Sequence, residues 1–429
     1  MKILLVTEYF YPQSAGGTEL YVYNLAKSLQ NKKHQVEILS VSDQTEKHIT
    51  YNNIKVHYLP FNHNYDTAVI SGEKPADNLD NFVTIVQSIN PSIVHFHTLT
   101  TSISTHHIEA VKKNGFKTLL TSHIAAHSCL RGTLMQSGKF ICNGKVEKQK
   151  CLSCYLQKKG IPEILSQLSA LTIHAAGFPT NLAKVVTRKQ AELTRLKTNL
   201  DQLVVVSNWQ KEVFISNNFD KNKIVLCRQA IELCKVSTIV KPKNRKLVIG
   251  FIGRISNIKG LHVLLAALKN VPVKEAELKV AAIPVSTESD YYQQQKQQVE
   301  KMQGSVWIEN LPNDKITDFI QSLDILCVPS QCLETGPFVV YEALAQGVPV
   351  LGSDLGGIKE LIIEGKNGWL FPHQNTTYLS KLITSFIVQK TAGKLLKNVE
   401  PLVRPIENLA TEMLTFYQHI LTGNEHSTS

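Results

Sequence analysis

The stretch that decides the fold of this chain runs from Ser330 to Leu344 and reads SQCLETGPFVVYEAL. The apolar run Asp324–Pro329 before it predicts a buried strand, and the residues from Val339 to Ala345 predict a helix. Glu334 then lies on the loop that leaves the strand, and Glu342 lies in the first turns of the helix. In an open parallel sheet this loop faces the crevice outside the carboxyl ends of the strands, where ligands bind.

The chemistry of this stretch favours a ligand that carries both hydroxyl groups and phosphate. The free amides at the N-terminus of the predicted helix form an anion site. Two carboxylates beside that site would repel an isolated phosphate, but they suit a ligand whose hydroxyls they can grip, such as a nucleotide sugar. The alternative is an ordinary strand–helix unit in which Glu334 and Glu342 are merely exposed.

A second strand brings two cations to the same crevice. The apolar run from Leu247 to Ile252 predicts a buried strand, and Arg254 and Lys259 follow it before a helix that begins at Leu261. Arginine binds phosphate oxygens as a fork and lysine acts as a point charge, so the pair can neutralise a diphosphate. The alternative is an arginine and a lysine on a surface turn.

The chain is organised as strands that alternate with helices, which predicts α/β domains with doubly wound parallel sheets. Its 429 residues suffice for about two or three domains. The polar, proline-containing segment 241–246 is the best boundary. We therefore expect an N-terminal domain over 1–240 with a cysteine-rich insertion at about 128–160, a C-terminal domain over 241–405, and a last helix over 406–422.

Composition narrows the partners and the compartment. Hydrophobic residues make up 43% of the chain, charged residues 19%, and the net charge is +11. This balance favours anionic partners, namely nucleotide phosphates, acidic lipid headgroups or nucleic acid. No apolar run approaches the roughly eighteen residues of a membrane helix, and the first residues predict a strand instead of a signal peptide. We expect a cytoplasmic protein whose eight cysteines are reduced or metal-bound.

These motifs resemble the retaining glycosyltransferases of family 4, also called glycosyl transferases group 1, which have the GT-B fold. Glu334 and Glu342 match the E-x7-E signature of that family, and 253–260 match its Gly-Arg-x4-Lys-Gly pattern. The sequences of residues 347–360 and 365–370 are also similar to the corresponding segments of such enzymes. The resemblance implies two Rossmann-like domains that face a central cleft, an acceptor-binding N-terminal domain, a donor-binding C-terminal domain, and a last helix that crosses back to the first domain.

The resemblance also implies roles for individual residues. The catalytic candidates are Arg254, Lys259, Glu334 and His123. The donor-binding candidates are Gly16, Gly17, Arg254, Lys259, Glu334, Gly336, Pro337, Phe338, Val339 and Glu342. His123 would reach the donor sugar, although Ile124 stands where the family usually has Asp. Because Pro337 lacks an N–H, phosphate contacts must fall to Phe338 and Val339.

The insertion carries four cysteines in the spacing Cys129-x12-Cys142-x8-Cys151-x2-Cys154. This spacing suits a tetrahedral structural zinc site, and a cysteine-containing branch of the same family looks similar. The alternative is four unrelated reduced thiols. Six lysines also make the insertion basic, which is either a solvated face or a rim that attracts an acidic acceptor or an anionic lipid surface.

The implied function is transfer of a hexose-type sugar from a nucleotide-diphosphate sugar to a hydroxyl acceptor. The acceptor would be a glycan, a lipid-linked molecule or a small molecule, as in polysaccharide or glycoconjugate biosynthesis. No cofactor is expected in catalysis, and the protein would work in the cytoplasm, either free or at the inner face of the membrane. A nucleotide-sugar epimerase of GT-B fold is an alternative. A zinc-knuckle protein that binds nucleic acid is a remote one, because only Phe140 and Tyr155 interleave with the basic residues.

Overall fold

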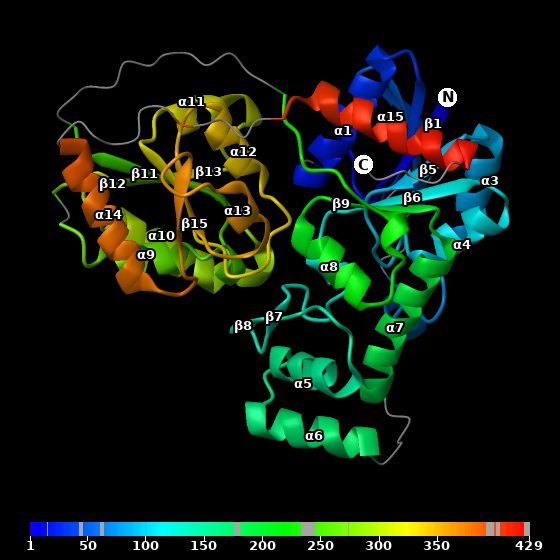
Figure 1. Ribbon diagram of the computed structural model, residues 1–429, viewed down its shortest axis with the longest axis horizontal. Coiled ribbons are helices and arrows are strands. Elements are labelled where there is room, and N and C mark those ends of the chain that lie inside the picture. The colour runs from blue at the N-terminus through cyan, green and yellow to red at the C-terminus, as the bar shows by residue number, and fades with distance from the viewer. Residues whose placement is uncertain are drawn as a thin grey trace. The chain divides into compact units, whose positions relative to one another are not determined.

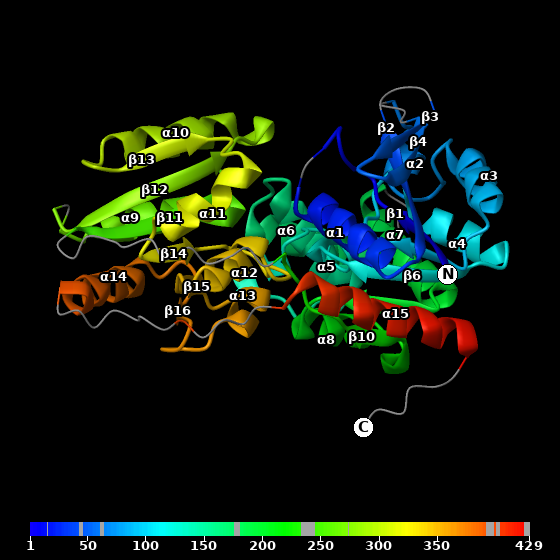
Figure 2. The same ribbon diagram turned by 90° about the horizontal axis from the view of Figure 1, so that it is seen from above.

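The computed structural model describes residues 1–14, 16–42, 46–60, 64–175, 181–232, 245–272, 274–391, 399 and 404–423. The chain divides into two compact units (Figures 1 and 2). Unit 1 comprises Met1–Ala230 and Ile406–Ser429, and unit 2 comprises Ile231–Pro405. The domain boundary expected between residues 240 and 241 lies outside the described residues.

Unit 1 is built on an eight-stranded sheet of order β10-β9-β6-β5-β1-β2-β4-β3, in which only β3 runs antiparallel to its neighbour. The parallel strands are short apolar runs because both faces of the sheet are covered. Their order reverses between β1 and β5. The strands are β1 (Lys2–Val6), β2 (Gln35–Ser42), β3 (Lys47–Tyr51), β4 (Ile54–Pro60), β5 (Ile93–Phe96), β6 (Lys117–Ser122), β9 (Gln202–Val205) and β10 (Ile224–Leu226).

Amphipathic helices of unit 1 bury an apolar stripe in the core beside this sheet. In α3, for example, Phe82, Ile85, Val86 and Ile89 recur at helical spacing and are buried together. Outside the insertion the helices of unit 1 are α1 (Gly17–Asn31), α2 (Thr67–Ile70), α3 (Leu79–Ile89), α4 (Thr105–Lys113), α7 (Asn181–Asn199), α8 (Asn208–Ser216) and α15 (Ile406–Thr422).

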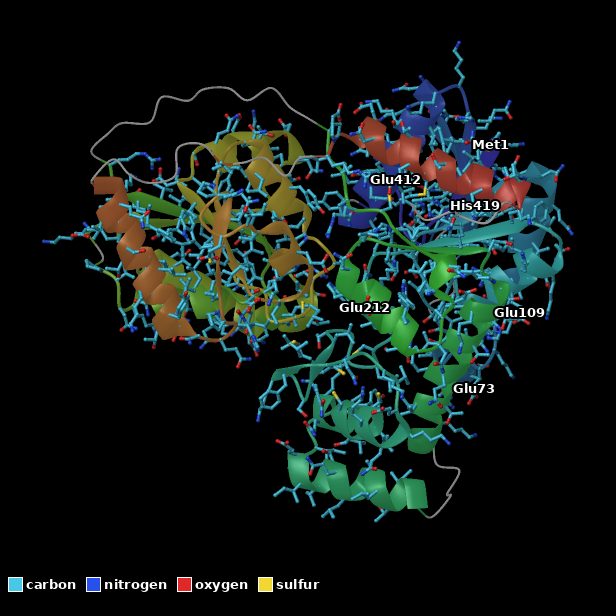
Figure 3. All side chains as sticks on the ribbon, in the orientation of Figure 1. Met1, Glu73, Glu109, Glu212, Glu412 and His419 are labelled. Atoms are coloured by element: carbon cyan, nitrogen blue, oxygen red, sulfur yellow. The ribbon has the colours of Figure 1, made fainter. Side chains whose placement is uncertain are left out.

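The C-terminal helix α15 is part of unit 1, although it is the last element of the chain; it carries the labelled Glu412 and His419 in Figure 3. The hydroxyl of its Tyr417 lies 2.7 Å from Nδ1 of His95, and Nε2 of His95 lies 2.7 Å from Oγ1 of Thr121. His95 and Tyr417 are fully buried. His95 is therefore a structural residue that ties α15 to β5 and β6.

An insertion between β6 and β9 contains a short hairpin and a helical pair (Figure 1). The hairpin is β7 (Met135–Gln136) with β8 (Phe140–Ile141), and the helices are α5 (Lys148–Lys158) and α6 (Glu163–Ala175). In both ribbon views α5 and α6 lie side by side. Among the described residues no helix combines the length and the apolar character that crossing a bilayer requires.

Unit 2 has a fully parallel six-stranded sheet of order β13-β12-β11-β14-β15-β16. Alternate residues of β11 enter two separate apolar clusters: Leu247, Ile249 and Phe251 point to one face, and Val248 points to the other. Helices therefore cover both faces, and the predicted doubly wound α/β fold class is confirmed. The strand order reverses between β11 and β14, which makes this the topological switch point of the sheet.

The elements of unit 2 are the following. Its strands are β11 (Leu247–Arg254), β12 (Ala276–Ile283), β13 (Val306–Glu309), β14 (Ile325–Val328), β15 (Val350–Ser353) and β16 (Gly368–Phe371). Its helices are α9 (Leu261–Leu268), α10 (Ser289–Glu300), α11 (Ile316–Gln321), α12 (Phe338–Ala345), α13 (Gly356–Leu361) and α14 (Thr376–Thr391).

Candidate active site

A cluster of charged residues lies at the switch point of unit 2. β11 ends at Arg254, and the loop after it carries Lys259. β14 pairs with β11, and the loop after β14 carries Glu334. Because the carboxyl ends of parallel neighbours meet at one edge of the sheet, residues far apart in the sequence come together there.

Glu334 and Lys259 form a partly buried ion pair. The Nζ atom of Lys259 lies 2.6 Å from Oε1 of Glu334, and the Ser330 hydroxyl donates a hydrogen bond of 2.8 Å to the same oxygen. Burial by itself would raise the pKa of Glu334, but Lys259, Ser330 and the more distant Arg254 lower it below its ordinary value. Glu334 is therefore an anion at neutral pH.

Close backbone contacts at Gly260 hold the loop after β11, which carries Lys259, against the loop after β14, which carries Glu334. We call these contacts the Gly260 clamp. Gly260 has φ +75°, and a Cβ atom there would lie 1.8 Å from the carbonyl oxygen of Pro329. The amide of Gln331 donates a hydrogen bond of 2.7 Å to the carbonyl of Ile258. A residue with a side chain at position 260 would push the lysine loop away from the glutamate loop.

Two further glycines support the Glu334 loop from behind. The amide of Gly357 donates a hydrogen bond of 2.6 Å to the carbonyl of Glu334. A Cβ atom on Gly357 would lie 2.6 Å from the Gly336 amide nitrogen, and one on Gly356 would lie 2.8 Å from the Glu334 carbonyl oxygen. The Gly-Gly pair after β15, known from the sequence only as a family likeness, therefore has a packing reason.

The helix α12 begins directly after this loop. Gly336 takes φ +119°, and Pro337 is the N-cap residue with φ −63° and no side-chain cap. The first turn of α12, which includes Phe338 and Val339, thus presents backbone amides without a capping side chain. The amides of Phe338 and Val339 therefore begin the helix directly after the loop that carries Glu334, as the sequence predicted.

The second carboxylate of the signature is in a different ionisation state. Glu342 is half-buried in α12, and burial raises its pKa to about 7. At neutral pH Glu342 is therefore partly protonated, whereas Glu334 is charged. Environments that push the pKa values of two acids apart commonly mark acids with separate tasks.

In unit 1, Gly16 and Gly17 lie at the start of α1. The Glu19 carboxylate is held by the Ser14 hydroxyl at 2.8 Å and lies 2.7 Å from the place of a Cβ atom on Gly16. An acid in the first turn of a helix complements the helix dipole. A carboxylate therefore stands at the N-terminus where a diphosphate was expected, and the role of Gly16 and Gly17 stays a prediction.

His123 follows β6 and belongs to a buried histidine row. Its Nε2 atom lies 3.2 Å from Nδ1 of His97, and its ring meets the edge of Tyr21 at a centroid distance of 4.6 Å. Burial lowers the pKa of His123 to about 3, so the imidazole is neutral. Contact of His123 with a donor sugar stays a prediction.

The sequence analysis did not identify two polar residues that follow strands at the switch points, Ser330 in unit 2 and Glu8 in unit 1. Ser330, which helps to hold Glu334 as an anion, gave no signal beyond its place in the quoted stretch. Glu8 follows β1 at the switch point of unit 1, is buried, and accepts a hydrogen bond of 3.3 Å from Ser102. Burial raises the pKa of Glu8. An acid directly after the first strand was the signal that could have identified it.

Unit 1 also has a hollow of about 230 Å³ at the carboxyl ends of β5 and β6. Hydroxyls of Thr100 and Ser104 line it, together with His127 and the Lys189–Glu192 pair, whose atoms approach to 2.5 Å. His127 is buried, and its Nε2 atom has no hydrogen-bond partner in the described part of the chain. The hollow therefore offers hydroxyl, charged and ring-nitrogen groups to a polar ligand.

The expected zinc site is not confirmed. Cys129, Cys142, Cys151 and Cys154 are free thiols that line one hollow of about 20 Å³. Within the described residues, however, no three His, Cys, Asp or Glu side chains are placed so that they could share a metal ion. Lining a hollow is a weaker condition than converging on the single tetrahedral point that zinc requires. Three sulfurs instead accept backbone amides, those of Ser137, Gly144 and Glu147.

Two family models match the chain. One, described as glycosyl transferases group 1, matches residues 237–400, and the other, described as Glycosyltransferase Family 4, matches residues 15–155. An uncharacterized 42.6 kDa protein in the cps region of Klebsiella pneumoniae is 24% identical over 378 residues. That match covers 84% of this chain and 87% of the relative.

Solved structures share the fold over nearly the whole chain. Anabaena HepE, in complex with UDP and glucose, has a TM-score of 0.61 at 15% identity and covers 99% of this chain and 98% of its own. Sucrose-phosphate synthase from Thermosynechococcus elongatus has a TM-score of 0.70 at 16% identity and covers 99% and 100%. At these identities the likeness shows the fold alone, and it confirms the predicted GT-B fold class.

We expect Gly260→Ala to destabilise unit 2 by at least about 2 kcal/mol more than Gly347→Ala. Both glycines have positive φ, +75° and +68°, but only Gly260 lacks room for a Cβ atom. Urea unfolding of a Trp209→Phe background measures this, because the remaining Trp307 and Trp369 both lie in unit 2. Equal losses for the two variants would show that the clamp is not needed.

We expect Glu342→Gln to gain stability relative to wild type as pH rises. The ordinary pKa of 4.5 is raised to about 7 in the folded state, so folded Glu342 binds a proton that the unfolded chain releases between these values. Wild-type stability therefore falls with rising pH in that window, and the glutamine variant escapes this loss. Thermal unfolding across pH 4 to 9 checks it, with Glu300→Gln, an exposed acid, as control. A pH-independent difference would contradict the assignment.

Proposed function

The chain belongs to the group 1, family 4 glycosyltransferases, and on that premise we propose that it moves a hexose from a nucleoside-diphosphate sugar to a hydroxyl acceptor with retention of the anomeric configuration. The observation that carries the proposal is the charged cluster at the switch point of unit 2. Lys259 pairs with Glu334 at 2.6 Å, and the charge of Arg254 also lowers the pKa of Glu334.

The cations have a clear task in such a reaction. When the sugar leaves, negative charge develops on the β-phosphate, and preorganised positive groups stabilise it most in the transition state. Arg254 is exposed at the end of β11, and Lys259 lies in the loop that follows this strand. The uncapped first turn of α12 adds amides at Phe338 and Val339. Together these groups would bind the diphosphate.

The carboxylates would hold the sugar parts of the donor. Charged Glu334 would accept hydrogen bonds from hexose hydroxyls while it keeps Lys259 in place. Glu342, with its pKa raised to about 7, can either donate or accept, which suits the two hydroxyls of a ribose.

The chemical step would be a front-face displacement, which the family resemblance implies. The bond from the anomeric carbon to the β-phosphate oxygen breaks, and the bond from that carbon to the acceptor oxygen forms on the same face. The acceptor proton passes to the departing phosphate oxygen, so no separate base is needed. The hydroxyl-lined hollow of unit 1 would receive the acceptor.

Donor choice and stereochemistry can be tested together. We expect one donor among UDP-glucose, UDP-galactose, GDP-mannose and ADP-glucose to raise the melting temperature, because a ligand that binds only the folded state stabilises it. Proton NMR of the sugar first released by slow hydrolysis of that donor should show the donor's own anomer. The opposite anomer would refute retention and leave transfer intact, whereas no shift with any donor would count against the donor class.

We expect Lys259→Ala to lower kcat/KM by about 10- to 150-fold, the range of one lost charged hydrogen bond. Because the variant also leaves Glu334 without its cation, Lys259→Ala combined with Glu334→Gln should lose less than the sum of the two single changes. Lys315→Ala, which removes an exposed lysine of the same unit, is the control. Wild-type rates in Lys259→Ala would refute the assignment of Lys259 to the leaving group.

A further inference from the structure

The helix α6 of the insertion exposes its large apolar residues. The exposed fractions are 73% for Ile164, 55% for Leu165, 54% for Leu168 and 47% for Leu171. Ile164, Leu168 and Leu171 follow the spacing i, i+4, i+7, so they form one stripe along the helix, and Leu165 borders it. In Figure 3 side chains project from the side of α6 that faces away from α5.

The opposite side of α6 is the one that packs on the protein, and its fully buried residues are small, although Ile173 near the end of the helix also packs against the core. Ser166 and Ala170 are fully buried, and the Ser166 hydroxyl lies 3.1 Å from that of Ser153 on α5. A helix whose only task is to cover a core buries its large apolar residues and exposes its small and polar ones. Here the large residues Ile164, Leu165, Leu168 and Leu171 are exposed instead, and no part of the chain that the structure describes covers their outer stripe.

The rest of the insertion adds exposed apolar groups and a strong positive charge. Phe140 and Ile141 of the β8 strand are 68% and 58% exposed. Residues 128–175 contain seven Lys and Arg residues against two Glu residues, a net charge of +5 out of +11 for the chain. Five of these lysines have exposed side chains, namely Lys139, Lys145, Lys148, Lys158 and Lys159.

We propose that the insertion docks the protein on an anionic lipid bilayer, with α6 lying in the plane of the interface and its stripe of Ile164, Leu165, Leu168 and Leu171 among the acyl chains. α6 itself carries no Lys or Arg, so its stripe would supply the apolar contact, and the lysines of the hairpin, of α5 and of the adjoining loops would supply the electrostatic attraction. With 13 residues, α6 is about 20 Å long, which is too short to span but sufficient to lie in the interface.

The charge distinguishes this occupant from the alternatives. A second copy of the chain would bring a second surface with a net charge of +5 against the first, which opposes self-association. A nucleic acid would match the charge, but it would leave an aliphatic stripe in water. An anionic bilayer satisfies both the stripe and the lysines. This inference does not depend on the proposed sugar transfer.

The test is binding of the full chain to vesicles, measured by co-sedimentation. We expect binding to vesicles of phosphatidylcholine with phosphatidylglycerol, and much weaker binding to phosphatidylcholine alone. Leu168→Glu with Leu171→Glu should lower the partition coefficient at least about tenfold, because two aliphatic side chains that would enter the acyl region are replaced by charged ones. The matched control, Ile363→Glu with Val388→Glu, changes two exposed aliphatics of unit 2 by the same charge and should bind as wild type.

The lysines are tested in the same way. Lys148→Gln, Lys158→Gln and Lys159→Gln together should weaken binding to the anionic vesicles, whereas Lys269→Gln, Lys301→Gln and Lys315→Gln, which neutralise three exposed lysines of unit 2, should change it much less. Unchanged circular dichroism and melting temperature would show that the variants fold.

Three results would overturn the proposal. The first is equal binding to neutral and anionic vesicles. The second is an equal loss of binding in the control variants. The third is no vesicle binding together with a lipid-free dimer, seen by light scattering, that Leu168→Glu with Leu171→Glu dissociates, which would make a second copy the occupant of the stripe.

Discussion

The contact on which the candidate site of unit 2 depends is the ion pair of Lys259 with Glu334 at 2.6 Å. It exists because β11 and β14 are parallel neighbours at the point where the strand order reverses, so the loops that follow them meet. Gly260 allows those two loops to approach closely, and Gly356 and Gly357 allow the segment after β15 to pack against the Glu334 loop. A partly buried ion pair contributes little net stability, and losing one partner is expensive because the other charge is left in a poorly solvated place. Such a pair is best understood as a prepared binding site.

The two glutamates of the signature illustrate how environment divides the work of identical side chains. Glu334 is surrounded by a lysine, a hydroxyl and a more distant arginine, which keep its pKa low in spite of burial. Burial dominates for Glu342, whose pKa rises to about 7. One acid is thus a fixed anion and the other is poised to exchange a proton at neutral pH. A donor that presents a hexose, a diphosphate and a ribose offers a distinct partner to each group of the cluster.

Unit 1 is assembled around buried polar contacts as well as apolar ones. His95 joins the chain's last helix to its central strands through Tyr417 and Thr121, and His97 contacts His123 beside it. These imidazoles are neutral because burial lowers their pKa values. The insertion between β6 and β9 is packed differently, since α6 buries the small residues Ser166 and Ala170 and exposes Ile164, Leu165, Leu168 and Leu171. The contrast separates the part of unit 1 that is packed on itself from the part that is prepared for another surface.

The sequence by itself determined the fold class, the strand β1 (Lys2–Val6) and the residues that line the switch point of unit 2. These features depend on apolar runs, glycines and charges at strand ends, each of which is confined to a few neighbouring residues. The sequence was a poor guide where the answer depended on how close residues lie in space. The cysteine spacing suggested zinc, yet spacing does not fix where sulfurs converge, and the described residues hold no shared metal position. Only the tertiary structure decided the position of the Glu19 carboxylate beside Gly16, the different pKa values of Glu334 and Glu342, and the outward face of α6. Burial and electric fields come from neighbours that are remote in the sequence.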